Sequence, residues 1–152
     1  FAPIVNAWAK KSRALDPMNE EEARKQIDKI DAKVLSNRKP PYGIIGGLYD
    51  ALVSSDGDAV AVNNDAARQA QALFLKLEGR DICSEAGVAL ASLIKKTEDG
   101  SIDENAAVML NVTGGGMDAL MRERNPIAAE PDLIVNRDED ANELKQKILS
   151  LF

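Results

Sequence analysis

The pattern with the clearest chemical potential is a threonine followed by three glycines, Thr113, Gly114, Gly115 and Gly116. It comes directly after residues 106–112, a run of mostly apolar residues. Glycines let a backbone approach a ligand closely, and a threonine hydroxyl can both donate and accept a hydrogen bond. The lysine and hydroxyl residue of a phosphate-binding P-loop are missing. The pattern therefore predicts either a ligand site or a plain turn in which Thr113 bonds its own backbone.

A second candidate is Glu85, which follows Cys83 and Ser84 and precedes a run of small and apolar residues at 86–94. Because the helix macrodipole favours negative charge at the first turn, an acid is well placed there. Two interpretations stay open, an acid in a ligand pocket and a simple helix start. Cys83 is predicted to be a small buried hydrophobe, because no basic neighbour in the sequence would activate its thiol.

The third candidate is the pair Arg38 and Lys39 on a loop rich in proline and glycine, residues 36–47. Prolines prevent regular structure and the glycines permit tight turns. Basic residues on such a loop could contact an anion. The alternative is an ordinary solvated loop.

Composition excludes several classes of site. The 152 residues include no histidine, which rules out histidine-based triads and histidine metal sites within this chain, and we predict no metal. The net charge of −6 disfavours nucleic acid and anionic membranes as partners. One cysteine excludes an internal disulfide and suits a reducing cytoplasm, where we expect the protein to act.

Hydrophobic periodicity and capping residues predict the elements that position these candidates. The predicted helices cover about residues 2–13, 19–34, 48–55, 65–79, 84–96, 117–124 and 140–151. The predicted strands cover residues 59–62, 106–112 and 132–135. Helices that alternate with short buried strands predict an α/β fold with a parallel sheet. The strands are few for a complete sheet, and the chain opens on an apolar stretch at Phe1. We therefore expect residues 1–152 to be a single partial domain of a longer protein.

Taken in order, these segments resemble the C-terminal part of the threonine synthase-like enzymes, which are pyridoxal-phosphate enzymes of fold type II related to the tryptophan synthase β group. The resemblance rests on "NRKPPYGIIGGLYDAL", "EGRDICSEAGVALASL" and "LNVTGGG" and spans about residues 1–120. Glu85 begins a Glu-Ala-Gly sequence where the family usually has Glu-Pro-Ala. Within the group, the segments look most like the cysteate synthases of methanogenic archaea.

The resemblance implies the three-layer, parallel-sheet large domain of fold type II, incomplete in this chain, with pyridoxal 5'-phosphate as cofactor. It implies that the Thr113 hydroxyl hydrogen-bonds the pyridine nitrogen. Gly114 and Gly115 would let the chain approach the ring, and Glu85 would lie close by. The Schiff-base lysine and the phosphate-binding loop are expected upstream. No lysine here is predicted to be catalytic, so the chain alone is expected to be inactive.

For the whole enzyme, the resemblance implies β-replacement that converts O-phospho-L-serine and sulfite to L-cysteate and phosphate, a step of coenzyme M biosynthesis. Arg38 and Lys39 are the candidate contacts to the substrate anion. The expected partners are a small amino-acid substrate and further copies of the same subunit. One alternative is a threonine synthase acting on O-phosphohomoserine. Another is a non-catalytic α/β module that binds a small molecule or regulates another protein.

Overall fold

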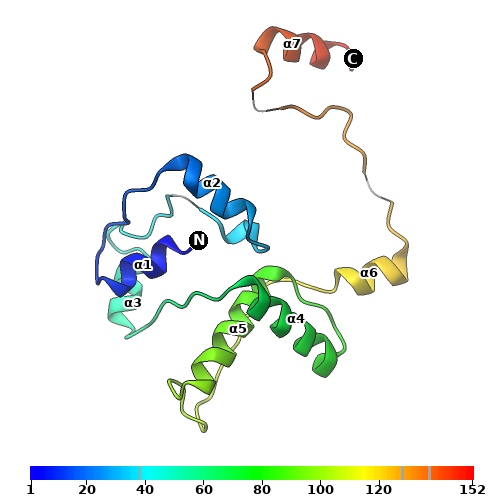
Figure 1. Ribbon diagram of the computed structural model, residues 1–152. Coiled ribbons are helices and arrows are strands. Elements are labelled where there is room, and N and C mark those ends of the chain that lie inside the picture. The colour runs from blue at the N-terminus through cyan, green and yellow to red at the C-terminus, as the bar shows by residue number, and fades with distance from the viewer. Residues whose placement is uncertain (38, 128, 137) are drawn as a thin grey trace. The chain divides into compact units, whose positions relative to one another are not determined.

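The computed structural model describes residues 1–37, 39–127, 129–136 and 138–152 (Figure 1). The chain divides into two compact units, Phe1–Ala119 and Leu120–Phe152. Its helices are α1 Pro3–Ala9, α2 Glu20–Asp28, the 3-10 helix η1 Lys33–Leu35, α3 Leu48–Ser54, α4 Asn64–Glu78, α5 Ser84–Glu98, α6 Met117–Arg124 and α7 Ala141–Leu149. None of the helices in these ranges is long and apolar enough to cross a membrane.

Side-chain caps start three of the helices. Asn19 accepts a hydrogen bond from the backbone N–H of Glu22 at 3.1 Å and so begins α2, as predicted. Asp140 accepts from the first backbone N–H groups of α7, also as predicted. The cap of α4 is Asn63, which lies before the two residues expected to cap this helix, Asn64 or Asp65, and it accepts from the N–H of Ala66 at 2.8 Å. These caps satisfy donors that a helix start would otherwise leave unpaired.

Two helices are shorter than predicted, and each ends for a visible reason. The first stops at Ala9 instead of residue 13, because Lys11 takes a left-handed conformation with φ of 51°. The helix α2 stops at Asp28 instead of continuing to residue 34. Asn64 of α4 donates to the carbonyl oxygen of Lys29 at 2.8 Å and accepts from the N–H of Asp31 at 3.3 Å. These contacts tie the chain to α4 where the helix would have continued.

Helices α4 and α5 pack against each other through small side chains (Figure 1). Ala67 and Ala70 of α4 are buried, as are Gly87 and Ala91 of α5. A Cβ atom on Gly87 would lie 2.6 Å from the Cγ atom of Gln71, so the close contact depends on glycine. Only this face of α5 is buried. The remaining residues of the run 86–94, outside this face, are half-buried.

The predicted strands are absent from the part of the chain that the structure describes. Residues 59–62, 106–112 and 132–135 carry no strand, and the β-pairing consists of one isolated antiparallel bridge between Ile82 and Gly115. A strand needs a neighbour that pairs its N–H and C=O groups. The described residues supply no such neighbour to these three segments. The predicted parallel sheet is therefore not met here, and the chain is rich in helix.

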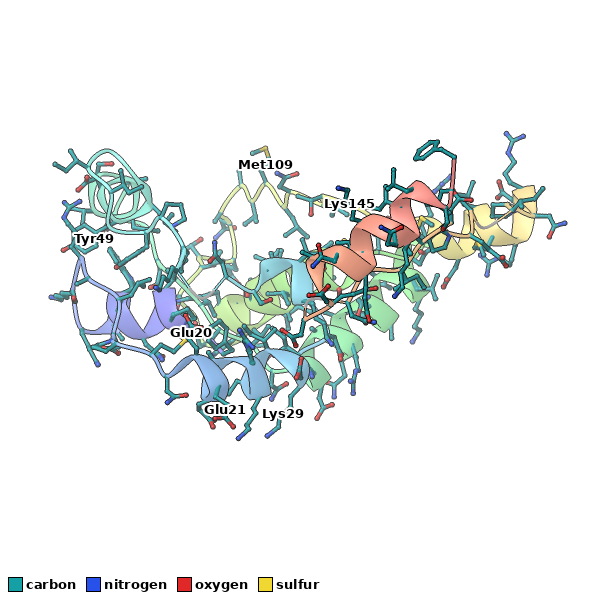
Figure 2. The ribbon with its side chains drawn as sticks, turned by 90° about the horizontal axis from the view of Figure 1, so that it is seen from above. Glu20, Glu21, Lys29, Tyr49, Met109 and Lys145 are labelled. Atoms are coloured by element: carbon teal, nitrogen blue, oxygen red, sulfur yellow. The ribbon has the colours of Figure 1, made fainter. Side chains whose placement is uncertain are left out.

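The segment 106–112 lies at the surface, contrary to the prediction of a covered strand. Met109 is 92% exposed, and Figure 2 shows its side chain projecting away from the ribbon. The segment leaves the end of α5, where the N–H of Ile102 donates to the carbonyl oxygen of Lys96. It returns to the start of α5, where the N–H of Cys83 donates to the carbonyl oxygen of Gly114. The chain thus runs back along α5 (Figure 1). The side chains of this segment are exposed, except that of Leu110, which is half-buried.

An aromatic cluster fixes the loop at residues 36–47. Among the described residues, Tyr42 has the largest fully buried side chain, and its hydroxyl donates to the carbonyl oxygen of Ser12 at 3.1 Å. Its ring meets that of Tyr49 edge-on, and the Arg13 guanidinium lies 4.6 Å from the centre of the Tyr49 ring. Arg13 also forms a two-bond ion pair with Asp50. The chain after α1 and the start of α3 therefore hold the loop from both sides.

The second unit, Leu120–Phe152, contains the helix α7 and the chain that leads to it. Lys147, in the last turn of α7, forms an ion pair with Glu139 just before the cap of this helix. Ile134, in the predicted third strand, is 74% exposed. This unit carries none of the predicted site residues.

Candidate functional site

The glycine turn pairs with the residues that precede α5. The N–H of Cys83 donates to the carbonyl oxygen of Gly114 at 3.0 Å, and the N–H of Gly116 donates to the main-chain oxygen of Asp81 at 2.9 Å. The Ile82–Gly115 bridge lies between these two bonds. Residues 114–116 therefore run antiparallel to residues 81–83. This pairing brings two of the sequence candidates together, the threonine–glycine turn and the start of the helix that carries Glu85.

The glycines are needed for this close approach between two backbones. A Cβ atom on Gly115 would overlap the main-chain oxygen of Asp81 and lie 2.7 Å from the Cα atom of Ile82. A Cβ atom on Gly114 would lie 3.2 Å from the Sγ atom of Cys83. Such contacts force neighbouring atoms to move. The packing against residues 81–83 thus explains why positions 114 and 115 are glycines. The approach of Gly114 and Gly115 to a cofactor ring stays a prediction.

Thr113 stands at the exposed end of this pairing. Among the described residues, its hydroxyl has no hydrogen-bond partner. The interpretation in which this hydroxyl bonds its own backbone is therefore wrong. A threonine hydroxyl that is exposed and unpaired can donate to, or accept from, an added group.

Glu85 lies in the first turn of α5 and is held as a carboxylate by local contacts. Its own backbone N–H is the main group that lowers its pKa, followed by the Cys83 thiol and the Ser84 hydroxyl. The Ser84 hydroxyl donates to Oε1 of Glu85 at 3.1 Å. These contacts favour the helix-start interpretation, and they make Glu85 a fixed negative charge instead of a proton donor. Cys83 itself is half-buried, which is less than the burial predicted for it as a small hydrophobe.

Asp81 is a residue of this site that the sequence analysis missed. Its Oδ2 atom accepts from the backbone N–H of Asp118 at 3.2 Å, in the first turn of α6. This bond is the largest cause of the lowered pKa of Asp81, and the N–H groups of Met117 and Ala119 contribute as well. The signal in the sequence was Gly116, because a glycine directly before a helix has no side chain to cap it. The unpaired backbone N–H groups at the start of α6 therefore need a cap from a distant part of the sequence.

Of the two basic loop residues, Arg38 lies outside the described residues. Lys39 is exposed, and its backbone N–H donates to the Oδ1 atom of Asn37 at 2.9 Å. The pocket that Lys39 lines is formed with Met18, Glu20 and Asn37. Neither Thr113 nor the helix start of α5 contributes to that pocket. The structure therefore does not bring Lys39 into one pocket with the threonine–glycine turn.

A separate cavity of about 260 Å³ does connect the loop with the start of α5. Asn37 of the loop lines it, together with Ser84 and Val88 of α5. Asn64, the first residue of α4, lines it as well. The remaining walls are mostly apolar and include Ile4 of α1. The cavity therefore faces the first turns of two helices, where backbone N–H groups favour a negative charge.

Almost all lysines of the chain lie at the surface. The exposed ones are Lys10, Lys11, Lys25, Lys29, Lys33, Lys39, Lys76, Lys95, Lys145 and Lys147. Lys96 is half-buried and forms an ion pair with Asp58. Figure 2 shows Lys29 and Lys145 on the outside of their own segments.

Comparison with known proteins adds the family. The chain is 42% identical over 147 residues to the cysteate synthase of Methanosarcina barkeri, a match that covers 95% of this chain and 35% of that protein. The same figures hold for the cysteate synthase of Methanosarcina mazei. That of Methanocorpusculum labreanum is 47% identical over 118 residues, covering 76% of this chain and 28% of that protein.

The chain is homologous to the cysteate synthases. The resemblance inferred from the three sequence segments is thereby confirmed. The chain spans about a third of the length of the cysteate synthases that it matches. No protein-family profile matches it. No solved structure matches it either.

Proposed function

We propose that the full-length protein carrying this chain is a pyridoxal-phosphate-dependent cysteate synthase that converts O-phospho-L-serine and sulfite to L-cysteate and phosphate. The observation that carries the proposal is the pairing of residues 114–116 with residues 81–83, which places an unpaired Thr113 hydroxyl beside the start of α5. Identity of 42% to cysteate synthases over almost the whole chain supports the same reaction. This chain contributes one side of the site, and the longer protein contributes the rest.

The cofactor, when bound, supplies an electron sink that lets the substrate lose its α-proton and then its phosphate. In our proposal the Thr113 hydroxyl hydrogen-bonds the pyridine nitrogen. A neutral hydroxyl stabilises a protonated nitrogen far less than a carboxylate would, because it brings no opposite charge. Such a site suits loss and replacement of a β-substituent. The covalent attachment to the protein comes from a lysine outside this chain.

The reaction breaks the bond between Cβ and the phosphate oxygen and forms a bond between Cβ and the sulfur of sulfite. Both the leaving group and the incoming group are anions, so the site must accommodate negative charge. The cavity lined by Asn37, Asn64 and Ser84 faces the first turns of α4 and α5, which suits that requirement. We propose that Arg38 and Lys39, on the adjoining loop, contact the same anions.

The test is a pair of measurements on the full-length protein. Addition of pyridoxal phosphate should produce a visible absorbance band, and O-phospho-L-serine with sulfite should yield L-cysteate and phosphate. Threonine formed from O-phosphohomoserine, with no L-cysteate from phosphoserine, would identify a threonine synthase instead. Absence of both the band and any turnover would favour the non-catalytic binding module.

The same proposal predicts the behaviour of this chain without the remainder of the protein. We expect no turnover and no lysine adduct with pyridoxal phosphate after borohydride reduction. A stable adduct on any lysine of this chain, detected by mass spectrometry, would contradict the placement of the covalent site elsewhere.

A further inference from the structure

Asp81 holds the glycine turn by two independent hydrogen bonds. Its main-chain oxygen accepts from the N–H of Gly116 at 2.9 Å. Its carboxylate oxygen Oδ2 accepts from the N–H of Asp118 at 3.2 Å. Asp81 therefore binds the turn at its last glycine, Gly116, and binds the first turn of α6 at Asp118. Thr113 lies at the other end of the same turn.

Besides these two bonds, the N–H of Cys83 donates to the carbonyl oxygen of Gly114 at 3.0 Å and holds the other end of the turn. Gly116 has a left-handed φ of 77°, and a Cβ atom there would meet nothing within 4 Å. Met117, the first residue of α6, is 58% exposed. Because no side chain precedes α6 to cap it, Asp81 supplies the cap from a distant part of the sequence. Loss of the carboxylate would leave the N–H of Asp118 without this partner.

Asp81 is also tied to the other half of the proposed site. It lies four residues before Glu85, on the strand-like segment that leads directly into α5. The N–H of Gln71 Nε2 on α4 donates to the carbonyl oxygen of Ile82 at 2.8 Å and fixes this segment from behind. Asp81 thus lies on a segment that α4 fixes and holds the Gly116 end of the turn, whereas the N–H of Cys83 holds the Gly114 end.

We propose that Asp81 is a positioning residue, which sets the place of the Thr113 hydroxyl relative to the start of α5 and thereby the strength and protonation behaviour of pyridoxal-phosphate binding. This inference rests on the proposed function. It adds a residue that contacts neither the cofactor nor the substrate. It acts through the two bonds to the turn.

The two carboxylate oxygens of Asp81 differ, and this difference allows a variant that keeps the helix cap of α6 but removes the negative charge. Oδ1 is buried and has no hydrogen-bond partner, whereas Oδ2 binds the N–H of Asp118. In the variant Asp81→Asn, the amide oxygen can still accept from Asp118, and the amide nitrogen takes the place of the unpaired Oδ1. The variant Asp81→Ala removes both oxygens. Asn should therefore restore what Ala loses.

The test uses the full-length protein with Asp81→Ala, Asp81→Asn and the control Asp99→Ala. Asp99 is a matched control, because it also accepts a backbone N–H, that of Ser101 at 2.9 Å, but at the far end of α5. The measurements are the dissociation constant of pyridoxal phosphate, the pH at which its visible band changes, and amide exchange at Gly116 and Asp118. They report on the site without requiring turnover.

For Asp81→Ala we expect amide exchange at Gly116 and Asp118 to rise about fivefold, the scale of a lost helix cap. The dissociation constant should rise by a similar factor, and the pH of the band change should shift. Asp81→Asn and Asp99→Ala should match the unaltered protein. If Asp81→Ala does not fold, Asp81→Ser, with a shorter acceptor, should weaken cofactor binding in the same direction.

Three results would overturn the inference. Unchanged exchange in Asp81→Ala would show that the turn is held otherwise. Faster exchange with unaltered cofactor binding and pH behaviour would show a purely structural cap. An equal loss in Asp99→Ala would show general destabilisation. Failure of the unaltered protein to bind pyridoxal phosphate would instead overturn the proposed function, and would be seen before any variant is compared.

Discussion

The backbone N–H of Cys83 lies 3.0 Å from the carbonyl oxygen of Gly114 and donates a hydrogen bond to it. This bond joins the start of α5 to the end of the exposed segment that returns along the same helix. Through it, the turn that follows Thr113 lies beside the start of the helix that carries Glu85, although the two segments are far apart in the sequence.

Gly115→Ala should destabilise the protein more than Gly116→Ala. The new Cβ at position 115 would overlap the main-chain oxygen of Asp81, which cannot rotate away as a side chain can. Overpacking of this kind typically costs about 1–3 kcal/mol. At Gly116 only the left-handed φ of 77° is unfavourable, at about 1 kcal/mol. Denaturant unfolding measures the free energy of unfolding of both variants. An equal loss of stability in the two would contradict the close backbone contact at Gly115.

Thr113→Ala should impair the enzyme, whereas Thr113→Ser should not. If the hydroxyl binds the pyridine nitrogen, its loss removes a hydrogen bond worth about 1 kcal/mol, or roughly a fivefold fall in cofactor affinity. Serine keeps the hydroxyl. Because Thr113 has no internal partner among the described residues, neither change should alter the unfolding midpoint. Loss of stability in Thr113→Ala would point to a structural role instead.

Arg38→Ala and Lys39→Ala should each raise the KM for O-phospho-L-serine or for sulfite and leave cofactor affinity unchanged. The reason is the loss of a positive charge on the loop whose neighbour Asn37 lines the cavity at the helix starts. Lys33→Ala is the control, since this exposed lysine lies before the loop and lines neither that cavity nor the pocket of Lys39. An unchanged KM for both substrates would refute the anion contact.

Glu85→Gln should lower stability near pH 7 and have little effect in acid. The pKa of Glu85 in the folded protein lies below its ordinary value of 4.5, mainly through its own backbone N–H. A lowered pKa means that the carboxylate contributes stability above pH 4.5 and that this contribution is lost as the pH falls through the lowered pKa. Unfolding midpoints at about pH 7 and about pH 3 test this.

The control for this experiment is Glu98→Gln at the opposite end of α5. There the helix macrodipole disfavours a negative charge, so this change should not destabilise the protein. A loss in Glu85→Gln of equal size at both pH values would show that packing, not charge, is responsible.

Asp50→Ala should loosen the loop that carries Lys39. Asp50 accepts from Arg13 and also from the N–H of Gly46 at 2.7 Å, so its carboxylate ties the loop to the chain after α1. Faster amide exchange at Gly46 and Gly47 is the expected result. Asp16→Ala removes an exposed ion pair with Lys10 and should leave these amides unchanged. Equal effects of the two variants would contradict the specific role of Asp50.

Local signals predicted the helices well. The caps Asn19 and Asp140 and the left-handed Gly79 at the end of α4 depend on only a few neighbouring residues. The sequence therefore contains all that determines them. Helix ends that depend on a distant residue were not predicted. Asn64 ends α2 by binding the carbonyl oxygen of Lys29, and no residue near Lys29 in the sequence indicates this contact.

The sheet and the cap of α6 could not be found in this way. Strand formation at residues 106–112 depends on a partner strand, which the described residues do not contain. The contact of Asp81 with Asp118 depends on the return of the chain along α5. The threonine–glycine turn was recognisable from its sequence, but the reason for Gly115, the main-chain oxygen of Asp81, emerged only from the structure.

The uncovered segment at residues 106–112 has a consequence for solubility. It is seven residues long, has no charge and no proline, and contains two valines, a methionine and a leucine, which together favour cross-β stacking. Asp103 and Glu104 precede it, separated from it only by Asn105, and act as gatekeepers whose like charges repel a second copy in register. Salt screens this repulsion, so a preparation kept at low salt should resist fibril formation best.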